Sequence, residues 1–216
     1  MRQQGKYDTE GLPEAQFEPG SRGRVLKNLR GITSKREMDE TEVQEQFRAL
    51  RELMTIYGAR HRFTAIDVCN IHKLWLGDIY EWAGKYRQVN ISKGGFLFAA
   101  ANHVSRLMAE FEKGPLRKYT PCAFASHDEI AMALAVVHVE LVLVHPFREG
   151  NGRVARMVAV LMALQAGLPL LDFSVIRGKK KKEYFAAVQS GMDRKYEPMI
   201  TVFSDVIRKT LRTHER

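Results

Sequence analysis

The chain has 216 residues, 45% of them hydrophobic, and its formal net charge is +9 at pH 7. This length and composition suit one compact domain with a sizeable core, and they exclude a membrane-spanning class because no apolar run approaches ~20 residues. The two cysteines, Cys69 and Cys122, exclude a disulfide framework or a cysteine metal cluster, whereas the positive charge favours acidic partners such as nucleotides, acidic protein surfaces or nucleic acid.

Residues 1–24 are rich in glycine, proline and charged residues and show no regular hydrophobic spacing. We expect an extended N-terminal arm there, followed by one domain over residues 25–216 with its core at about 64–208. The polar start is unlike a signal peptide, which predicts a cytoplasmic protein.

Two amphipathic helices are expected next. Hydrophobic residues recur at helical spacing over residues 35–57, where Thr33 or Ser34 can cap the first turn. The second helix, Thr64–Leu76, starts with a capping threonine and carries His72, for which we favour a structural role over a ligand role.

A β-hairpin is expected after these helices. Two short β-capable runs, Val89–Ile91 and Phe96–Phe98, flank Lys93-Gly94-Gly95. Glycines between two such runs are typical of a tight hairpin turn.

The next predicted helix, Ala101–Glu112, ends at Gly114-Pro115, and residues 118–126 are expected to form a loop. Ser126 or Asp128 can then cap a further helix. The run from 130 to 144 is long and apolar enough for this helix to be largely buried. His138 lies within the run, and we expect a packed core residue there rather than a second catalytic histidine.

The buried helix leads into Val144-His145-Pro146-Phe147-Arg148-Glu149-Gly150-Asn151-Gly152-Arg153-Val154-Ala155-Arg156, after which helical spacing resumes until Gly167. This stretch is therefore a tight connection between two buried helices. The second helix starts near Asn151, where unpaired backbone N–H groups and a partial positive charge are presented. Gly150 and Gly152 lack a Cβ atom and can adopt positive φ, so the loop can cradle phosphate groups.

Side chains of the same stretch supply the other parts of a nucleotide site. Arg153 and Arg156 are three residues apart, so they share a helix face on which both can bind phosphate oxygens. Glu149 offers the hard oxygen ligand that Mg²⁺ prefers. His145 is the residue type best suited to take a proton from a hydroxyl near neutral pH. The motif indicates nucleotide chemistry with a built-in general base.

The C-terminal part supplies a crossing segment and two more helices. Residues 168–174 are expected to be non-helical. The four lysines at 179–182 could suggest nucleic-acid binding, but we favour a solvated start of the adjoining helix. The last helix, near residues 197–211, should close the bundle.

The stretch from His145 to Arg156 resembles the Fic family motif, His-Pro-Phe-x-Asp/Glu-Gly-Asn-Gly-Arg-x-x-Arg, at every defined position. The lead-in formed by Phe17–Gly20 and Val25–Thr33 is also similar to Fic proteins, as is the run Glu81–Arg87 with the hairpin after it. The resemblance implies a fold of the all-α class, a helix bundle with a small β-hairpin flap over the active site. It further implies an adenylyltransferase, a toxin or effector that moves AMP from ATP to a Ser, Thr or Tyr hydroxyl of a target protein.

The resemblance also implies a role for each motif residue. His145 would be the general base, Glu149 would bind Mg²⁺, and Phe147 would anchor the loop in the core. Arg156 would act in catalysis by orienting the α-phosphate, together with Arg153. The implied nucleotide-binding residues are Phe147, Gly150, Asn151, Gly152, Arg153, Arg156 and, from the segment that approaches the adenine in this family, Tyr184.

The flap implies a protein partner. An exposed sheet edge can bind an extended target segment as an added strand and bring its hydroxyl to the base. Such pairing tolerates many sequences, so it identifies neither the target nor the modified residue. The residues expected to dock the target are Ile91, Ser92, Lys93, Gly94, Gly95 and Phe96.

Many Fic proteins are held inactive by a helix with the pattern Ser/Thr-x-x-x-Glu-Gly/Asn, whose glutamate pairs with the second arginine of the motif. In this chain Thr33–Glu37 is followed by Met38, and Thr41–Glu45 by Gln46, so neither segment completes the pattern. We therefore expect the brake to be a separate, small antitoxin-like inhibitor protein.

Two other functions compete with AMP transfer. A Doc-like kinase, or a transferase of another nucleoside monophosphate, would use a similar loop, but Doc-type motifs carry lysine at the position of Gly152. A basic nucleic-acid-binding or adaptor protein would account for the charge and the lysine run. It gives no reason for His145, Glu149 and Arg156 to surround a glycine-rich loop, so neither nucleic acid nor a membrane is an expected partner.

Overall fold

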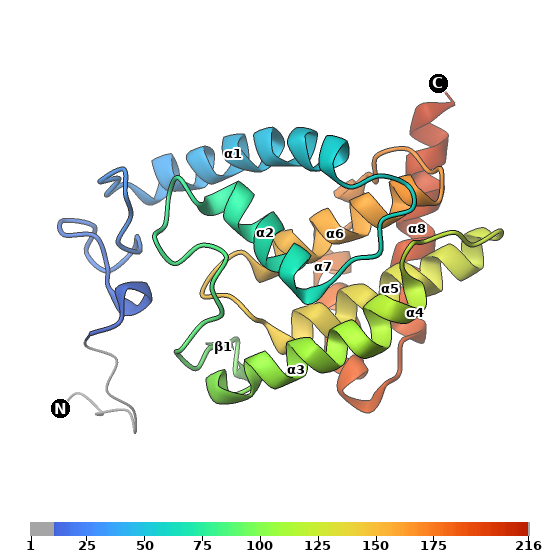
Figure 1. Ribbon diagram of the computed structural model, residues 1–216. Coiled ribbons are helices and arrows are strands. Elements are labelled where there is room, and N and C mark those ends of the chain that lie inside the picture. The colour runs from blue at the N-terminus through green and yellow to red at the C-terminus, as the bar shows by residue number, and fades with distance from the viewer. Residues whose placement is uncertain (1–10, 216) are drawn as a thin grey trace.

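The computed structural model describes residues 11–215, and it confirms the prediction of an all-α fold with one small hairpin (Figure 1). Short 3-10 turns precede or follow several helices, and a π turn spans Glu112–Leu116. The α-helices are α1 (Lys35–Ile56), α2 (Ala65–Leu76), α3 (Val104–Phe111), α4 (Arg117–Tyr119), α5 (His127–Val144), α6 (Asn151–Gln165), α7 (Lys179–Ser190) and α8 (Glu197–His214).

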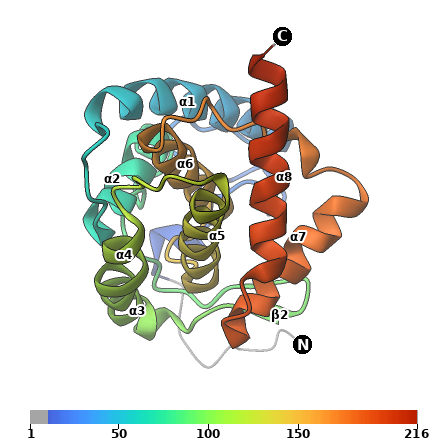
Figure 2. The same ribbon diagram turned by 90° about the vertical axis from the view of Figure 1, so that its right-hand side faces the viewer.

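Helices α5 and α6 occupy the centre of the molecule. Figure 2 shows them surrounded by α1, α2, α3 and α4 on one side and by α7 and α8 on the other. Most side chains of α5 are buried, as expected for a helix that is apolar on every face, and α5 packs along both α6 and α8. The connection between the two central helices therefore starts from the end of a buried, closely packed helix.

Polar caps start the helices where the sequence predicted them. Ser34 accepts a hydrogen bond from the backbone N–H of Glu37 at the start of α1. Thr64 begins α2 with a capping box, in which its hydroxyl accepts from Asp67 N and the Asp67 carboxylate accepts from Thr64 N. Ser126 begins α5 in the same way. These contacts satisfy N–H groups that would otherwise lack partners.

Two predicted boundaries are wrong. The helix expected to stop at Gly114-Pro115 continues through the π turn into α4, because Leu116 and Tyr119 are drawn into the core and this burial overrides the helix break. The first strand was expected at residues 89–91, but β1 comprises Ser92–Lys93. It starts later because both backbone polar groups of Val89 are already bonded, its N–H to Glu14 and its carbonyl to Arg87.

The hairpin itself is short and tight. Strand β1 pairs antiparallel with β2 (Phe96–Leu97), with Ser92 opposite Leu97 and Lys93 opposite Phe96. Gly94 and Gly95 form the turn with φ values of +57° and +80°, a region that glycine occupies without strain.

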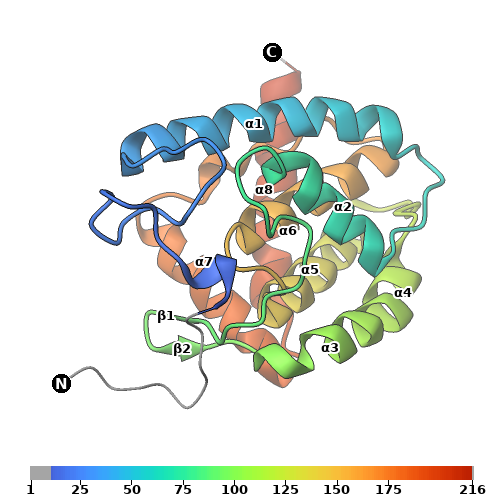
Figure 3. The ribbon, with the colours of Figure 1, turned by 60° about the vertical axis from the view of Figure 1, so that its left-hand side comes forward.

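The described part of the predicted arm, residues 11–24, packs against the domain beside the hairpin (Figure 3). Phe17 forms an isolated β-bridge with Leu26. The carboxylate of Glu14 is buried and accepts hydrogen bonds from the N–H groups of Gln88 (2.6 Å) and Val89 (3.1 Å). The described part of the arm is thus bonded to the domain, and the arm's first ten residues lie outside the described part.

Across residues 11–215, no helix combines the length and the apolar character needed to cross a membrane.

Candidate active site

The loop between α5 and α6 is fastened to the core by its middle residues. Phe147 is fully buried, and its N–H donates to Asn151 Oδ1 (2.8 Å) while Asn151 Nδ2 donates to the Phe147 carbonyl (2.7 Å). The anchoring role expected for Phe147 agrees with this position. Both side chains are directed into the protein, so Phe147 and Asn151 shape the loop from beneath, and a ligand would meet the loop's backbone.

His72 is part of this foundation. Its ring stacks on Phe147 with centroids 3.9 Å apart and planes 6° apart. Its Nδ1 accepts from Gly84 N (2.7 Å), so Nε2 carries the hydrogen and donates to the Glu149 carbonyl (3.2 Å). Burial lowers the pKa of His72 to about 3, which keeps the ring neutral. The structural role that we favoured for this histidine agrees with these contacts.

His145 ends α5 and faces the loop. It adopts the left-handed conformation, with φ +52°, which turns the chain out of the helix. Its Nδ1 lies 2.9 Å from the Val142 carbonyl, which can act only as an acceptor, so Nδ1 carries the hydrogen and Nε2 keeps a free lone pair. Burial lowers the pKa of His145 to about 4, so the ring is neutral at pH 7.

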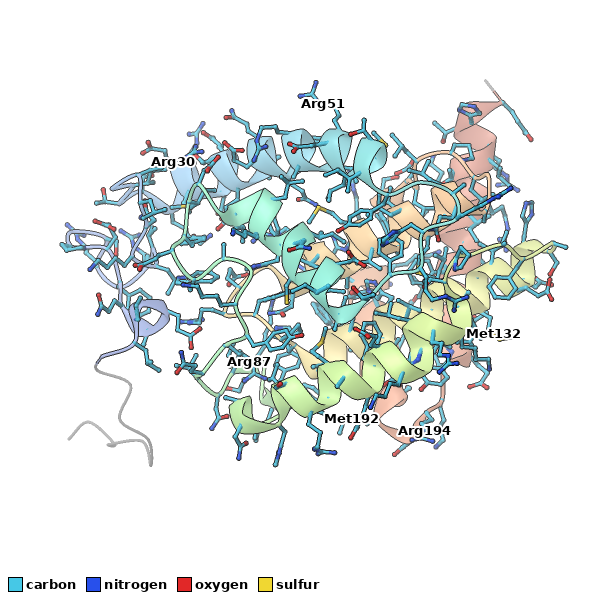
Figure 4. All side chains as sticks on the ribbon, viewed as in Figure 1. Arg30, Arg51, Arg87, Met132, Met192 and Arg194 are labelled. Atoms are coloured by element: carbon cyan, nitrogen blue, oxygen red, sulfur yellow. The ribbon has the colours of Figure 1, made fainter. Side chains whose placement is uncertain are left out.

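Arg87 ties the hairpin to the histidine, a role that sequence reasoning missed. The side chain is 2% exposed and lies inside the loop that leads to the hairpin (Figure 4). Its guanidinium donates to the carbonyls of His145 (2.7 Å), Val89 (2.8 Å) and Ala99 (2.5 Å). Val89 and Ala99 stand on the two sides of the hairpin, so one arginine fixes both against the end of α5, where helix carbonyls favour a cation.

The two glycines of the loop differ in what surrounds them. A Cβ atom on Gly150 would lie 2.7 Å from the Trp75 ring, and its φ is +82°, so packing and backbone both require glycine there. A Cβ on Gly152 would meet nothing within 4 Å. Gly152 therefore faces open space at the N-terminal end of α6, where a phosphate could approach the backbone.

Glu149 has the donor chemistry that a Mg²⁺ site needs. Its side chain is 51% exposed, and Oε1 accepts from Gly150 N (2.9 Å), whereas no residue of 11–215 bonds to the other carboxylate oxygen. Mg²⁺ is commonly held by one or two carboxylates plus phosphates and water. A single carboxylate beside the open N-terminal end of α6 fits that pattern.

The two arginines of the motif contact different neighbours. Arg153 Nη1 forms an ion pair with Glu42 Oε2 (2.6 Å), and its guanidinium carbon lies 4.5 Å from the Trp75 ring centroid. Among residues 11–215, no carboxylate pairs with Arg156, and its Nε is buried without a hydrogen-bond partner. Arg153 is thus held by α1 and α2, whereas Arg156 keeps hydrogen-bonding capacity for a ligand.

A cavity of about 390 Å³ opens beside Arg156. Tyr184 lies on its wall, and its hydroxyl is 2.7 Å from His138 Nε2. Burial raises the pKa of Tyr184 and lowers that of His138 to about 4, so this pair is a neutral, packed contact. Arg177 and Lys181 also line the cavity, and sequence reasoning missed both because it interpreted the basic run as a solvated helix start.

The hairpin reaches His145 through a residue just beyond the predicted docking set. Phe98 stacks on the His145 ring, whereas Ser92, Lys93, Gly94 and Gly95 are exposed at the tip. The structure therefore brings together the hairpin, the histidine, the glycine loop, Glu149 and both arginines, and it adds Arg87, Glu42 and the basic cavity wall.

Comparisons with known proteins fit this geometry. Residues 62–163 match the model of the Fic/DOC family. The chain is 30% identical over 164 residues to Protein adenylyltransferase VbhT of Bartonella schoenbuchensis. This alignment covers 75% of this chain and 33% of that protein. It is 27% identical over 158 residues to Protein adenylyltransferase Fic of Aedes aegypti, covering 73% of this chain and 30% of that one. The chain spans about a third of the length of these relatives.

Solved structures share the fold over nearly the whole chain. The N-terminal Fic domain of a VirB-translocated Bep effector from Bartonella quintana, solved with bound ADP, is 26% identical with a TM-score of 0.71, covering 90% of this chain and 95% of that one. BepC from Bartonella tribocorum, solved with bound AMPPNP, has a TM-score of 0.69 at 24% identity and covers 91% of this chain and 97% of that chain.

Proposed function

The chain belongs to the Fic/DOC family, and from that premise we propose that it transfers AMP from ATP to a hydroxyl group of a target protein. The observation that carries the proposal is the state of His145. Its Nδ1–H is bound to the Val142 carbonyl and its low pKa keeps it neutral, so Nε2 is an available base beside an open phosphate cradle.

In this reaction the target hydroxyl gives its proton to His145 Nε2 while its oxygen attacks the α-phosphorus of ATP. The bond from the α-phosphorus to the bridging oxygen breaks, and pyrophosphate leaves. Because positioning and charge neutralisation dominate such transfers, the backbone N–H groups at the start of α6 and the guanidinium groups of Arg153 and Arg156 would hold the phosphates in line.

The proposal extends to the rest of the nucleotide. The cavity beside Arg156 would take the nucleoside, with Tyr184 on its wall and Arg177 and Lys181 at its rim. Glu149 would hold Mg²⁺, which neutralises phosphate charge when bound.

The hairpin would dock the target as an added strand. Its tip is exposed, and its base is fixed to His145 through Arg87, so a docked segment would lie next to the general base. We extend the proposal to a cytoplasmic toxin or effector. Two free, buried thiols, Cys69 and Cys122, support a reducing compartment.

A separate inhibitor protein is part of the same proposal. Within the described residues, the Glu37 side chain forms no ion pair or hydrogen bond, and Glu45 pairs with Arg30 and Arg48. Neither reaches Arg156, which leaves that arginine accessible to a carboxylate from another chain.

The test compares the protein with its His145→Ala variant, using Mg²⁺, cell lysate and ATP labelled at either the α or the γ phosphorus. Label on protein from the α position only, and only with His145 present, is expected. The variant should retain ATP affinity, because the base acts only in the chemical step. Label from the γ position would make the protein a Doc-like kinase. Salt-dependent DNA binding with no label would favour the adaptor alternative.

A further inference from the structure

One acidic residue of α1 reaches the candidate active site. Glu42 is 3% exposed, and both of its carboxylate oxygens are bonded. Oε2 pairs with Arg153 Nη1 (2.6 Å), and Oε1 accepts from the Tyr80 hydroxyl (2.8 Å). Its backbone carbonyl also accepts from Trp75 Nε1 (2.8 Å), so α1 is fixed to α2 at this point.

Glu42 and Trp75 constrain the Arg153 guanidinium from two directions. The carboxylate binds one edge, and the indole ring lies 4.5 Å below the guanidinium carbon. Trp75 is in turn packed against Gly150, where no Cβ would fit. The other terminal nitrogen of Arg153, Nη2, is turned toward the loop and lies 3.7 Å from Glu149 Oε1.

We propose that Glu42 is a positioning residue, which holds the Arg153 guanidinium in the orientation that binds the phosphates of ATP. This inference rests on the proposed function. Glu42 occupies the Nη1 edge and leaves Nη2 directed at the phosphate cradle, so it orients the arginine without covering its ligand-facing side. A carboxylate with both oxygens bonded and almost no exposure is a fixed support, because moving it would leave a buried charge unpaired.

Glu45 offers a matched control on the same helix. Its side chain is 15% exposed and pairs with Arg30 (2.7 Å) and Arg48 (2.6 Å), and neither arginine belongs to the loop. Like Glu42, Glu45 is a largely buried carboxylate of α1 that pairs with arginine. Neutralising it therefore removes a similar charge and leaves the contacts of Arg153 unchanged.

The experiment measures two quantities for Glu42→Gln and Glu45→Gln in the full chain: the affinity for a non-hydrolysable ATP analogue with Mg²⁺, and AMP transfer from α-labelled ATP. Glutamine can still accept from Tyr80, so the fold is retained while the charge is lost. We expect Glu42→Gln to weaken analogue binding and to lower kcat/KM for ATP by roughly 10- to 100-fold, and Glu45→Gln to change neither. Tyr80→Phe removes the hydrogen bond to one Glu42 oxygen, so it should reduce analogue affinity and kcat/KM by a smaller factor. This variant replaces Glu42→Gln in the test if Glu42→Gln does not fold.

A double variant tests whether Glu42 acts through Arg153. With Arg153→Gln already present, Glu42→Gln should cause no further loss of binding or rate, whereas additive losses would overturn the proposal. Unchanged kinetics in Glu42→Gln would overturn it too. Faster AMP transfer in that variant would also overturn it, because Glu42 would then restrain the reaction. If the wild-type protein transfers no AMP but Glu42→Gln still weakens analogue binding through Arg153, the positioning role holds and the proposed reaction fails.

Discussion

The imidazole of His145 lies face to face with the phenyl ring of Phe98, with centroids 3.6 Å apart and planes 18° apart. Phe98 follows β2, so the hairpin that would dock a target also covers the proposed base. The N–H of Phe98 donates to the Ile91 carbonyl (3.2 Å), which fixes Phe98 to the opposite side of the hairpin. The ring shields one face of the imidazole from water and limits its rotation.

Replacing Phe98 by alanine should raise the pKa of His145 from about 4 toward its ordinary value, because the ring that helps to bury the imidazole is lost. The rate of AMP transfer should fall roughly tenfold or more, because the base is less well oriented. NMR titration of the His145 ring checks the first effect. Leu97→Ala removes a neighbouring side chain that is 68% exposed, and an equal pKa change there would refute the stacking explanation.

The two loop glycines should respond oppositely to alanine. Gly150→Ala forces a Cβ to within 2.7 Å of Trp75, so the free energy of unfolding should fall by about 1–3 kcal/mol or more. Gly152→Ala has free space within a helix, so stability should be unchanged or raised by up to about 1 kcal/mol, while ATP affinity falls because the methyl group obstructs the phosphates. Urea unfolding and calorimetric ATP titration separate the two effects. Full ATP affinity in Gly152→Ala would remove Gly152 from the phosphate cradle.

Arg156→Ala should weaken ATP binding with little loss of stability. The guanidinium forms no ion pair within the described residues and its Nε is unsatisfied, so the folded protein loses little without it. The lost charged hydrogen bonds correspond to about 1.5–3 kcal/mol, or roughly a 10- to 100-fold rise in Kd. Arg51, which points away from α1 into solvent (Figure 4), gives a control in which alanine leaves Kd unchanged. A wild-type Kd for Arg156→Ala would exclude it from the site.

Stability should decrease as the pH is lowered below the ordinary pKa of histidine. The folded-state pKa is about 3 for His72 and about 4 for His138 and His145. Between pH 6.5 and about 4 the unfolded chain therefore binds protons that the folded chain does not, so the free energy of unfolding falls by up to about 1.4 kcal/mol per pH unit for each histidine. Urea unfolding at pH 7.5 and pH 5 measures the slope. His138→Gln should lower this slope by the contribution of one proton. A stability that does not change with pH would contradict the burial of these rings.

Local patterns in the sequence were enough to place the starts of α1, α2 and α5 and the loop between α5 and α6. Ser34, Thr64 and Ser126 cap the helices they were expected to cap, because a cap bonds to N–H groups only three residues away. The loop from His145 to Gly150 could also be placed from a local pattern, because the helical hydrophobic spacing stops before it and resumes after it.

The tertiary structure decided which distant groups meet that loop. Arg87 is 58 residues from His145, and Trp75 lies 33 residues from Glu42. These partners depend on how α1, α2 and the hairpin pack against the α5–α6 connection, and no short-range pattern encodes that arrangement.

The sequence by itself therefore determined which functional groups this connection carries: a histidine, a glycine-rich turn, a glutamate and two arginines. Only the tertiary structure decided how they are presented, with Arg153 bound to Glu42, Arg156 left facing a cavity, and His145 covered by Phe98. The physical reason is that residue types and helix periods are local properties. The orientation and pKa of a side chain depend on burial and on contacts with residues far along the chain.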